Sequence, residues 1–115
     1  MNVYGIPSCG TVKKAKAWLS ARNIPFEAID FRATPPSKQQ VEAWVDAFGA
    51  KAMRNTSGGA YRALPDSKKE WSEAQWTEAF AEDPMLIKRP ILERDGTPLK
   101  VGFRGTDDEL EAALL

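Results

Sequence analysis

The sequence predicts an α/β (α+β) fold in which a βαβ unit and a ββα unit share one mixed four-stranded sheet. Short apolar runs at residues 2–6 and 26–32 flank an amphipathic helical pattern, which is the order of a parallel βαβ unit. Near the C-terminus, an Asp95-Gly96 pair separates two strand-like runs and indicates an antiparallel hairpin. The stretch between these two units has helical patterns and predicts an insertion at about residues 37–83.

The first strand is expected at "NVYGI", residues 2–6, where a β-branched and an aromatic residue precede Pro7. The first helix is expected to follow Cys9 and to end before Pro25. Its apolar residues at helical spacing are Val12, Ala15, Trp18 and Leu19. The second strand, "FEAIDFR", then lies parallel to the first.

The insertion is expected to hold two helices with clear start and stop signals. Ser-x-x-Gln capping boxes begin them at Ser37 and Ser72, and Gly49 and Pro84 end them. Between the two helices, residues 54–62 ("RNTSGGAYR") form a polar, glycine-rich loop that we expect to lack regular structure. The apolar stripes of the two insertion helices predict core packing, and this packing accounts for the tryptophans of the insertion.

The last third, "MLIKRPILERDGTPLKVGF", predicts a strand, an interruption at Pro90, a second strand, the Asp95-Gly96 turn and a final strand. A closing helix follows in "TDDELEAALL", where Thr106 and Glu109 form a third capping box. No linker or repeat interrupts the chain, so residues 1–115 are expected to be one domain.

Composition excludes several classes of function. The 16 basic and 16 acidic residues balance, so no global field draws the chain to nucleic acid or to an anionic membrane. No stretch has the pattern of a signal peptide or a membrane span, and a cytoplasmic location is expected. The chain has no histidine, which excludes Cys–His and Ser–His–Asp catalysis and most mixed-ligand zinc sites, so no metal site is expected.

The single cysteine, Cys9, is the candidate nucleophile. A cysteine at a helix N-terminus has its pKa lowered by the helix dipole and by unpaired backbone N–H groups. Gly10 allows the backbone to approach a bound group, and the hydroxyls of Ser8 and Thr11 are further donors to an oxyanion. The alternative is that Cys9 is a small buried hydrophobe, as lone intracellular cysteines often are.

These features together resemble a known family. The order βαβ, helical insertion, ββα, with a cysteine at the first helix and a proline before a hairpin strand, looks like the thioredoxin fold. Four motifs narrow the resemblance to the arsenate reductase (ArsC)/Spx/YffB family, and closest to its YffB-like branch. They are "YGIPSCGTVKKAKAWL", "NTSGGAYR", "LIKRPIL" and "KVGF", which together span almost the whole chain.

The resemblance implies that Pro90 has a cis peptide bond and faces the thiol. It also implies that Arg89 binds the substrate anion and stabilises the Cys9 thiolate. The alternatives are an ordinary edge-strand proline and a solvated arginine.

The chain departs from the arsenate reductase pattern at the other two arginines of that family. Asn55 falls at one of these sites, with Arg54 one place early. Arg104 lies near the other, but Phe103 or Gly105 also fits the alignment. Fewer arginines weaken the case for arsenate, since each would give a charge-assisted hydrogen bond to the oxyanion.

The YffB-like branch implies a glutathione-dependent thiol reductase with glutathione as co-substrate and no bound cofactor. Asn55, Thr56 and Arg62 then become candidates for holding glutathione, or they cap a helix end in a polar loop. Because the chain has one thiol, the second must come from another molecule. Expected partners are glutathione and glutaredoxin, with the protein a monomer.

A second class of function, a transcriptional regulator, is also compatible with the sequence. Spx-like proteins share the fold and bind RNA polymerase, and several carry a Cys-x-x-Cys switch. Val12 stands where the second cysteine would lie, which excludes that intramolecular disulfide. Binding to RNA polymerase without the switch, or a catalytically silent family member, remains the alternative.

Overall fold

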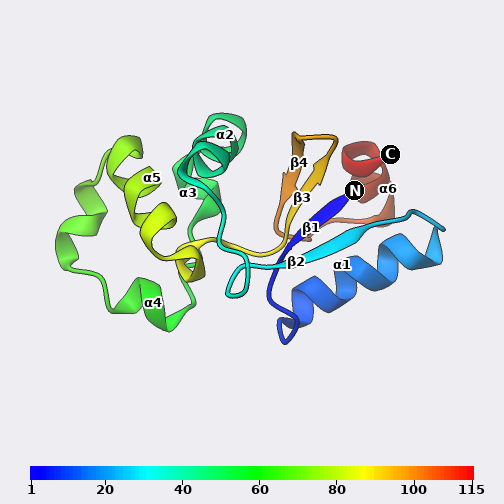
Figure 1. The fold of residues 1–115 in the computed structure, drawn as a ribbon, viewed down its shortest axis with the longest axis horizontal. Helices are drawn as coiled ribbons and strands as arrows, with labels where there is room; N and C mark the ends of the chain where they lie inside the picture. The colour runs from blue at the N-terminus through cyan, green and yellow to red at the C-terminus, as the bar shows by residue number, and fades with distance from the viewer. The chain divides into compact units, whose positions relative to one another are not determined.

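The computed structural model describes all 115 residues and divides them into two compact units. The sheet unit comprises Met1–Thr34 and Arg89–Leu115, and the helical unit comprises Pro35–Lys88. The insertion expected at about residues 37–83 lies inside the helical unit. Figure 1 traces both along the chain. No helix is both long and apolar enough to cross a membrane.

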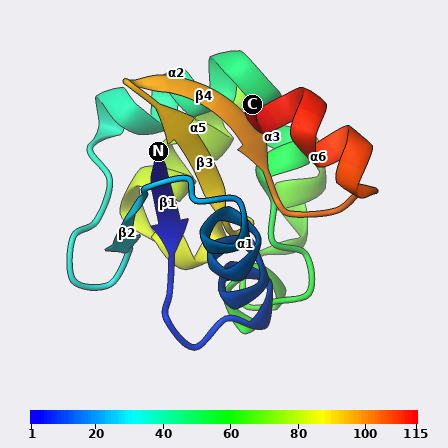
Figure 2. The same cartoon turned by 90° about the vertical axis from the view of Figure 1, so that its right-hand side faces the viewer.

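The sheet unit contains the predicted mixed four-stranded sheet, in the order β2-β1-β3-β4. Strands β1 and β2 are parallel, and the β1–β3 and β3–β4 pairs are antiparallel. The fold class is therefore confirmed, and Figure 2 shows the strands side by side. Their bounds are Asn2–Gly5 for β1, Glu27–Asp30 for β2, Ile91–Arg94 for β3 and Thr97–Val101 for β4.

The β3–β4 hairpin closes through the predicted turn. Asp95 has a φ of 51° and Gly96 a φ of 79°, and two consecutive positive φ values are the geometry of a type I′ turn. Sequence patterning was wrong about a strand before Pro90. Pro84–Leu86 forms a 3₁₀ turn (η2) instead, because the Asp83 carboxylate accepts a hydrogen bond from the Met85 backbone N–H at 3.0 Å.

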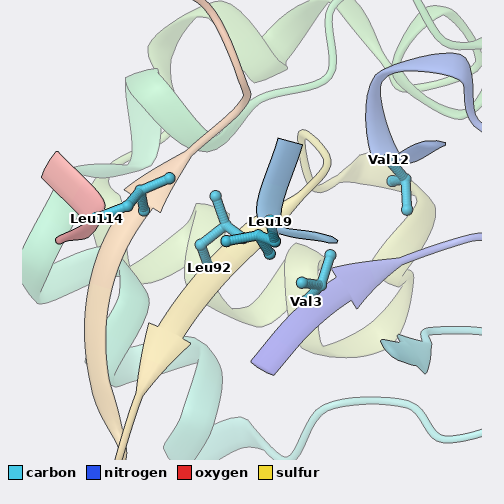
Figure 3. Close-up of a cluster of buried hydrophobic side chains, with 5 residues drawn as sticks. All are labelled: Val3, Val12, Leu19, Leu92 and Leu114. Carbon is cyan, nitrogen blue, oxygen red and sulfur yellow. The ribbon is translucent and has the colours of Figure 1, made fainter. Parts of the chain in front are cut away.

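Two helices of the sheet unit contribute to one core cluster. These are α1 (Gly10–Ala21) and α6 (Asp107–Leu114). Side chains from both helices meet those of two paired residues on β1 and β3, so the helices pack against the same face of the sheet. The members, shown in Figure 3, are Val3, Val12, Leu19, Leu92 and Leu114.

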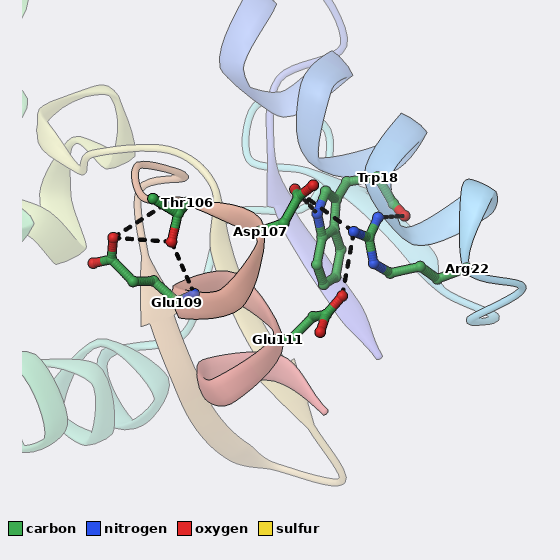
Figure 4. A network of polar contacts seen from close by, with 6 residues as sticks. All are labelled: Trp18, Arg22, Thr106, Asp107, Glu109 and Glu111. Atoms are coloured by element: carbon green, nitrogen blue, oxygen red, sulfur yellow. Dashed lines mark hydrogen bonds and ion pairs between the residues drawn. The ribbon is translucent and has the colours of Figure 1, made fainter.

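A polar network also joins α1 to α6 (Figure 4). The Arg22 guanidinium lies 3.8 Å from the ring centroid of Trp18, and the indole Nε1 donates to Asp107 Oδ1 at 3.1 Å. Arg22 Nη2 lies 3.6 Å from the Asp107 carboxylate and 3.5 Å from that of Glu111. Thr106 forms the predicted capping box at the start of α6.

The helical unit contains α2, α3, α4, η1, α5 and η2. Both predicted N-caps are present, since Ser37 Oγ and Ser72 Oγ each accept a backbone N–H three residues later. Gly49 ends α2 with a φ of 83°. Residues 54–62, expected to be irregular, include the short helix α4. The bounds are Lys38–Phe48 (α2), Ala50–Met53 (α3), Gly59–Arg62 (α4), Asp66–Glu70 (η1) and Glu73–Glu82 (α5).

Candidate active site

Cys9 is the N-cap residue of α1 and is half-buried. Two hydrogen bonds fix its backbone at this position. The Cys9 N–H donates to the Ile6 carbonyl at 3.1 Å, and the Cys9 carbonyl accepts from the Lys13 N–H at 3.0 Å. The chain thus leaves β1, makes one tight turn and delivers the thiol to the start of the helix.

The environment of Cys9 favours the thiolate. Burial raises the pKa of the Cys9 thiol, but hydrogen bonds from the backbone N–H groups of Val12 and Thr11 lower it. The Arg89 guanidinium lowers this pKa further, by a hydrogen bond and by its charge. The net result is a pKa below the ordinary cysteine value, so the thiolate is stabilised without a histidine.

Gly5 allows this arrangement, and sequence reasoning missed it. A Cβ at Gly5 would lie 2.5 Å from Val12 Cγ2 and 3.6 Å from the Arg89 Cβ. Only a residue without a side chain lets the end of β1 come so close to α1. A glycine at a strand end beside a candidate nucleophile was the available signal for such a close approach.

Arg89 and Pro90 begin the second segment of the sheet unit. The Arg89–Pro90 peptide bond is cis, which agrees with what the resemblance implies. Pro90 is buried, and its carbonyl accepts from the Gly102 N–H at 2.8 Å, which ties it to the end of β4. Arg89 is half-buried, and its hydrogen bond to the thiol joins two residues that lie 80 positions apart in the sequence.

The other predicted residues of the sheet unit differ in their surroundings. Ser8 is exposed, Thr11 is half-buried, and the position of a Cβ on Gly10 is open, with no atom within 4 Å. Arg104 is exposed after β4, whereas the neighbouring Phe103 ring packs edge-on against Trp18 at 5.9 Å between centroids. Of these two, Arg104 is the more exposed.

Asn55, Thr56 and Arg62 lie in the helical unit, in and beside a local turn. Asn55 Oδ1 accepts from Ser57 Oγ at 3.2 Å, and Arg62 Nη1 donates to the Ser57 carbonyl at 2.8 Å. Thr56 is exposed. The turn therefore engages the side chains of Asn55 and Arg62, and the role of all three residues in holding glutathione stays a prediction.

Arg54 has surroundings that the sequence pattern did not indicate. Its guanidinium carbon lies 4.4 Å from the ring centroid of Trp76, and this contact spans 22 positions of the chain. No local signal reports such a pair. The structure contains no group of three or more His, Cys, Asp or Glu side chains that could hold a metal ion.

Comparison with known proteins identifies relatives over almost the whole chain. The model of the ArsC family matches residues 4–112. "Uncharacterized protein YusI" of Bacillus subtilis is 39% identical over 115 residues, which is 96% of this chain and 95% of that protein. "Global transcriptional regulator Spx" of Streptococcus agalactiae is 30% identical over 111 residues, which is 94% of this chain and 78% of the regulator.

Solved structures agree with the family match. The YFFB protein has a TM-score of 0.86 at 32% identity and covers 99% of this chain and 98% of its own. A possible arsenate reductase from Streptococcus mutans has a TM-score of 0.83 at 34% identity, with 96% of each chain covered. The predicted resemblance to the ArsC/Spx/YffB group is therefore confirmed.

Proposed function

This chain belongs to the ArsC family, and on that premise we propose that it is a glutathione-dependent reductase whose only thiol nucleophile is Cys9. The family supports a thiol oxidoreductase. One observation carries the finer proposal: the backbone N–H groups of Val12 and Thr11, together with the Arg89 guanidinium, hold the pKa of the Cys9 thiol below its ordinary value. A lowered pKa raises the fraction of Cys9 that is thiolate, and the thiolate is the nucleophile in thiol–disulfide exchange.

With a glutathione mixed disulfide as substrate, the reaction needs no further group. The Cys9 thiolate attacks the glutathione sulfur, a new disulfide forms between Cys9 and glutathione, and the substrate leaves as a thiolate that takes a proton from water. A glutathione thiolate then attacks the same glutathione sulfur. This step releases the Cys9 thiolate and oxidised glutathione, so two electrons pass from glutathione to the substrate.

An oxyanion such as arsenate is the second substrate class. The Cys9 thiolate attacks As(V), and hydroxide leaves as water after gaining a proton. A glutathione thiolate then attacks the Cys9 sulfur and forms a disulfide with it, while the sulfur–arsenic bond breaks and its electron pair stays on arsenic, which departs as As(III). A second glutathione attacks this disulfide, which releases the Cys9 thiolate and oxidised glutathione. Arg89 is the one arginine that lowers the pKa of the Cys9 thiol. A single arginine beside the thiol favours the disulfide substrate over an oxyanion, which would need charge-assisted hydrogen bonds from three arginines.

The remaining predicted residues have binding roles in this proposal. Ser8, Gly10 and Thr11 lie at the helix start beside Cys9, where backbone and hydroxyl donors suit the glutathione backbone or an oxyanion. In the sheet unit, contacts to glutathione are proposed for Pro90 and Arg104. Asn55, Thr56 and Arg62 of the helical unit remain candidates for such contacts from the sequence alone. We also propose glutaredoxin as a partner, a monomeric state, and a cytoplasmic location, where glutathione is available.

A regulator that binds RNA polymerase is the second candidate, and the 30% identity to Spx favours it. Val12 still stands where the second cysteine of a Cys-x-x-Cys switch would be. A regulatory form would therefore sense oxidation through a mixed disulfide at Cys9 rather than through an internal one.

The deciding experiment is the pH dependence of Cys9 alkylation, together with turnover of a glutathione mixed disulfide and of arsenate. We expect a Cys9 pKa below about 8.5, the value of a free cysteine, and turnover of at least one substrate that Cys9→Ser abolishes. Arg89→Gln, which keeps polarity but removes the charge, should raise the pKa of Cys9 and slow turnover. An ordinary pKa with no turnover of either substrate would overturn the reductase and leave the regulator.

A further inference from the structure

The helical unit contains a second cation that is held on an aromatic ring. Arg54 is half-buried, and its guanidinium carbon lies 4.4 Å from the centroid of Trp76. Its backbone is fixed on both sides. Arg54 pairs with Ile87 in an isolated antiparallel bridge, the Asn55 N–H donates to the Leu86 carbonyl at 2.9 Å, and the Lys88 N–H donates to the Met53 carbonyl at 2.7 Å.

The ring under Arg54 is itself immobilised. Trp76 is only 1% exposed, and three aromatic neighbours surround it. Tyr61 is stacked with a centroid distance of 6.2 Å, Trp71 meets the ring edge-on at 4.9 Å, and Phe80 lies tilted at 5.7 Å. The guanidinium is therefore preorganised by a rigid support, which reduces the entropy lost when it binds a ligand.

Arg54 has no anionic partner within the protein. It makes no ion pair, its Nε is buried without a hydrogen-bond acceptor, and so is the Nε1 of Trp76. A second cation, Lys68, is 8% exposed in the same cluster, where its Nζ lies 4.2 Å from the Tyr61 ring and donates to the Tyr61 carbonyl. No carboxylate forms an ion pair with it either.

The same chain shows what completes such a stack. Arg22 lies over Trp18 at 3.8 Å, and the carboxylates of Asp107 and Glu111 approach its terminal nitrogen at 3.6 and 3.5 Å. Asp107 also accepts from the Trp18 indole. In that pair, oxyanions satisfy both the guanidinium and the indole N–H. At Arg54 and Trp76 the Nε and Nε1 atoms are buried without an acceptor, so the terminal nitrogens of Arg54 are the ones open to a ligand.

We propose that the Arg54 guanidinium, supported by Trp76, is a binding site of the helical unit for the oxyanion of an external ligand. The shared chemistry of the ligand is a pair of oxygens that matches the planar fork of arginine, as in a carboxylate or a phosphate-type anion. Lys68 adds positive charge to the same cluster. This inference does not depend on Cys9, so it stands or falls separately from the proposed reductase.

The test uses full-length Cys9→Ser protein, which removes all thiol chemistry from the measurement. Acetate and inorganic phosphate are titrated separately at constant ionic strength, and the indole N–H resonances of the four tryptophans are followed by NMR. The Trp76 resonance should move and saturate. A shift with phosphate alone identifies a tetrahedral oxyanion, and a shift with acetate alone identifies a carboxylate.

Matched variants locate the site. Arg54→Gln should weaken anion affinity by about tenfold or more, since a charge-assisted hydrogen bond is worth about 1.5–3 kcal/mol. Lys51→Gln removes the same charge from an exposed position of the same unit and should leave the affinity unchanged. Arg54→Lys keeps the charge but loses the fork, and an intermediate affinity is expected. A Trp76 resonance that stays still, or that moves equally in Arg54→Gln, would overturn the proposal.

Discussion

The two arginine–tryptophan stacks of this protein have the same contact and different polar surroundings. At Arg22 and Trp18 in the sheet unit, two carboxylates of α6 pair with the guanidinium, so the stack joins two helices. At Arg54 and Trp76 in the helical unit, no carboxylate pairs with the guanidinium, and the ring lies in the core. The first stack therefore serves the fold, and the second leaves its guanidinium without an anionic partner in the protein.

Burial of the ring is where the two stacks should differ most. Trp76→Ala should lower the free energy of unfolding by about 3–5 kcal/mol, because it removes a core side chain that is only 1% exposed and leaves a cavity. Trp18 is half-buried, so Trp18→Ala should cost clearly less. Equilibrium denaturation in urea measures both values. Equal losses would show that the Trp18 network stabilises the fold as strongly as a core ring does.

Local helix caps should behave alike in the two units. Ser72 in the helical unit and Thr106 in the sheet unit each form a complete capping box. Ser72→Ala and Thr106→Ala should each lower the free energy of unfolding by about 1 kcal/mol, since each leaves a backbone N–H of the first turn without its acceptor. The same denaturation assay tests them, with Ser67→Ala as a control at an exposed position outside any box. A large difference between the two caps would contradict this equivalence.

The caps also show what the sequence can predict. Ser72, Thr106 and the Asp95-Gly96 turn act on atoms a few residues away, so their patterns in the sequence predicted these helix starts and the hairpin correctly. The prediction of a strand before Pro90 was wrong because of another local hydrogen bond. Asp83 caps a 3₁₀ turn there, and the apolar pattern of residues 85–87 does not reveal that competing hydrogen bond.

The candidate site divides in the same way. The position of Cys9 at a helix start was predictable because the helix signal lies next to it in the sequence. The effect of Arg89 on the Cys9 thiolate was inferred only through the family resemblance. Arg54 on Trp76 was not predictable, since the two residues belong to different helical segments and share no spacing rule. Contacts of this kind depend on tertiary packing, and only the structure reports them.

The smallest effect expected is a pH dependence of stability that belongs to the sheet unit alone. Because the folded-state pKa of Cys9 is lowered, the unfolded chain binds more protons than the folded chain between that pKa and about 8.5, the value of a free cysteine. The stability gained from the thiolate is therefore fully present above about 8.5 and is lost as pH falls through the folded pKa. The unfolding free energy of the parent protein minus that of Cys9→Ser, measured under reducing conditions, should rise with pH across this window.

Arg54→Gln in both backgrounds should leave the slope unchanged, because every group that shifts the Cys9 pKa lies in the sheet unit. A flat difference across the window would contradict a stabilised thiolate, and a slope altered by Arg54→Gln would show that the two units are electrostatically coupled.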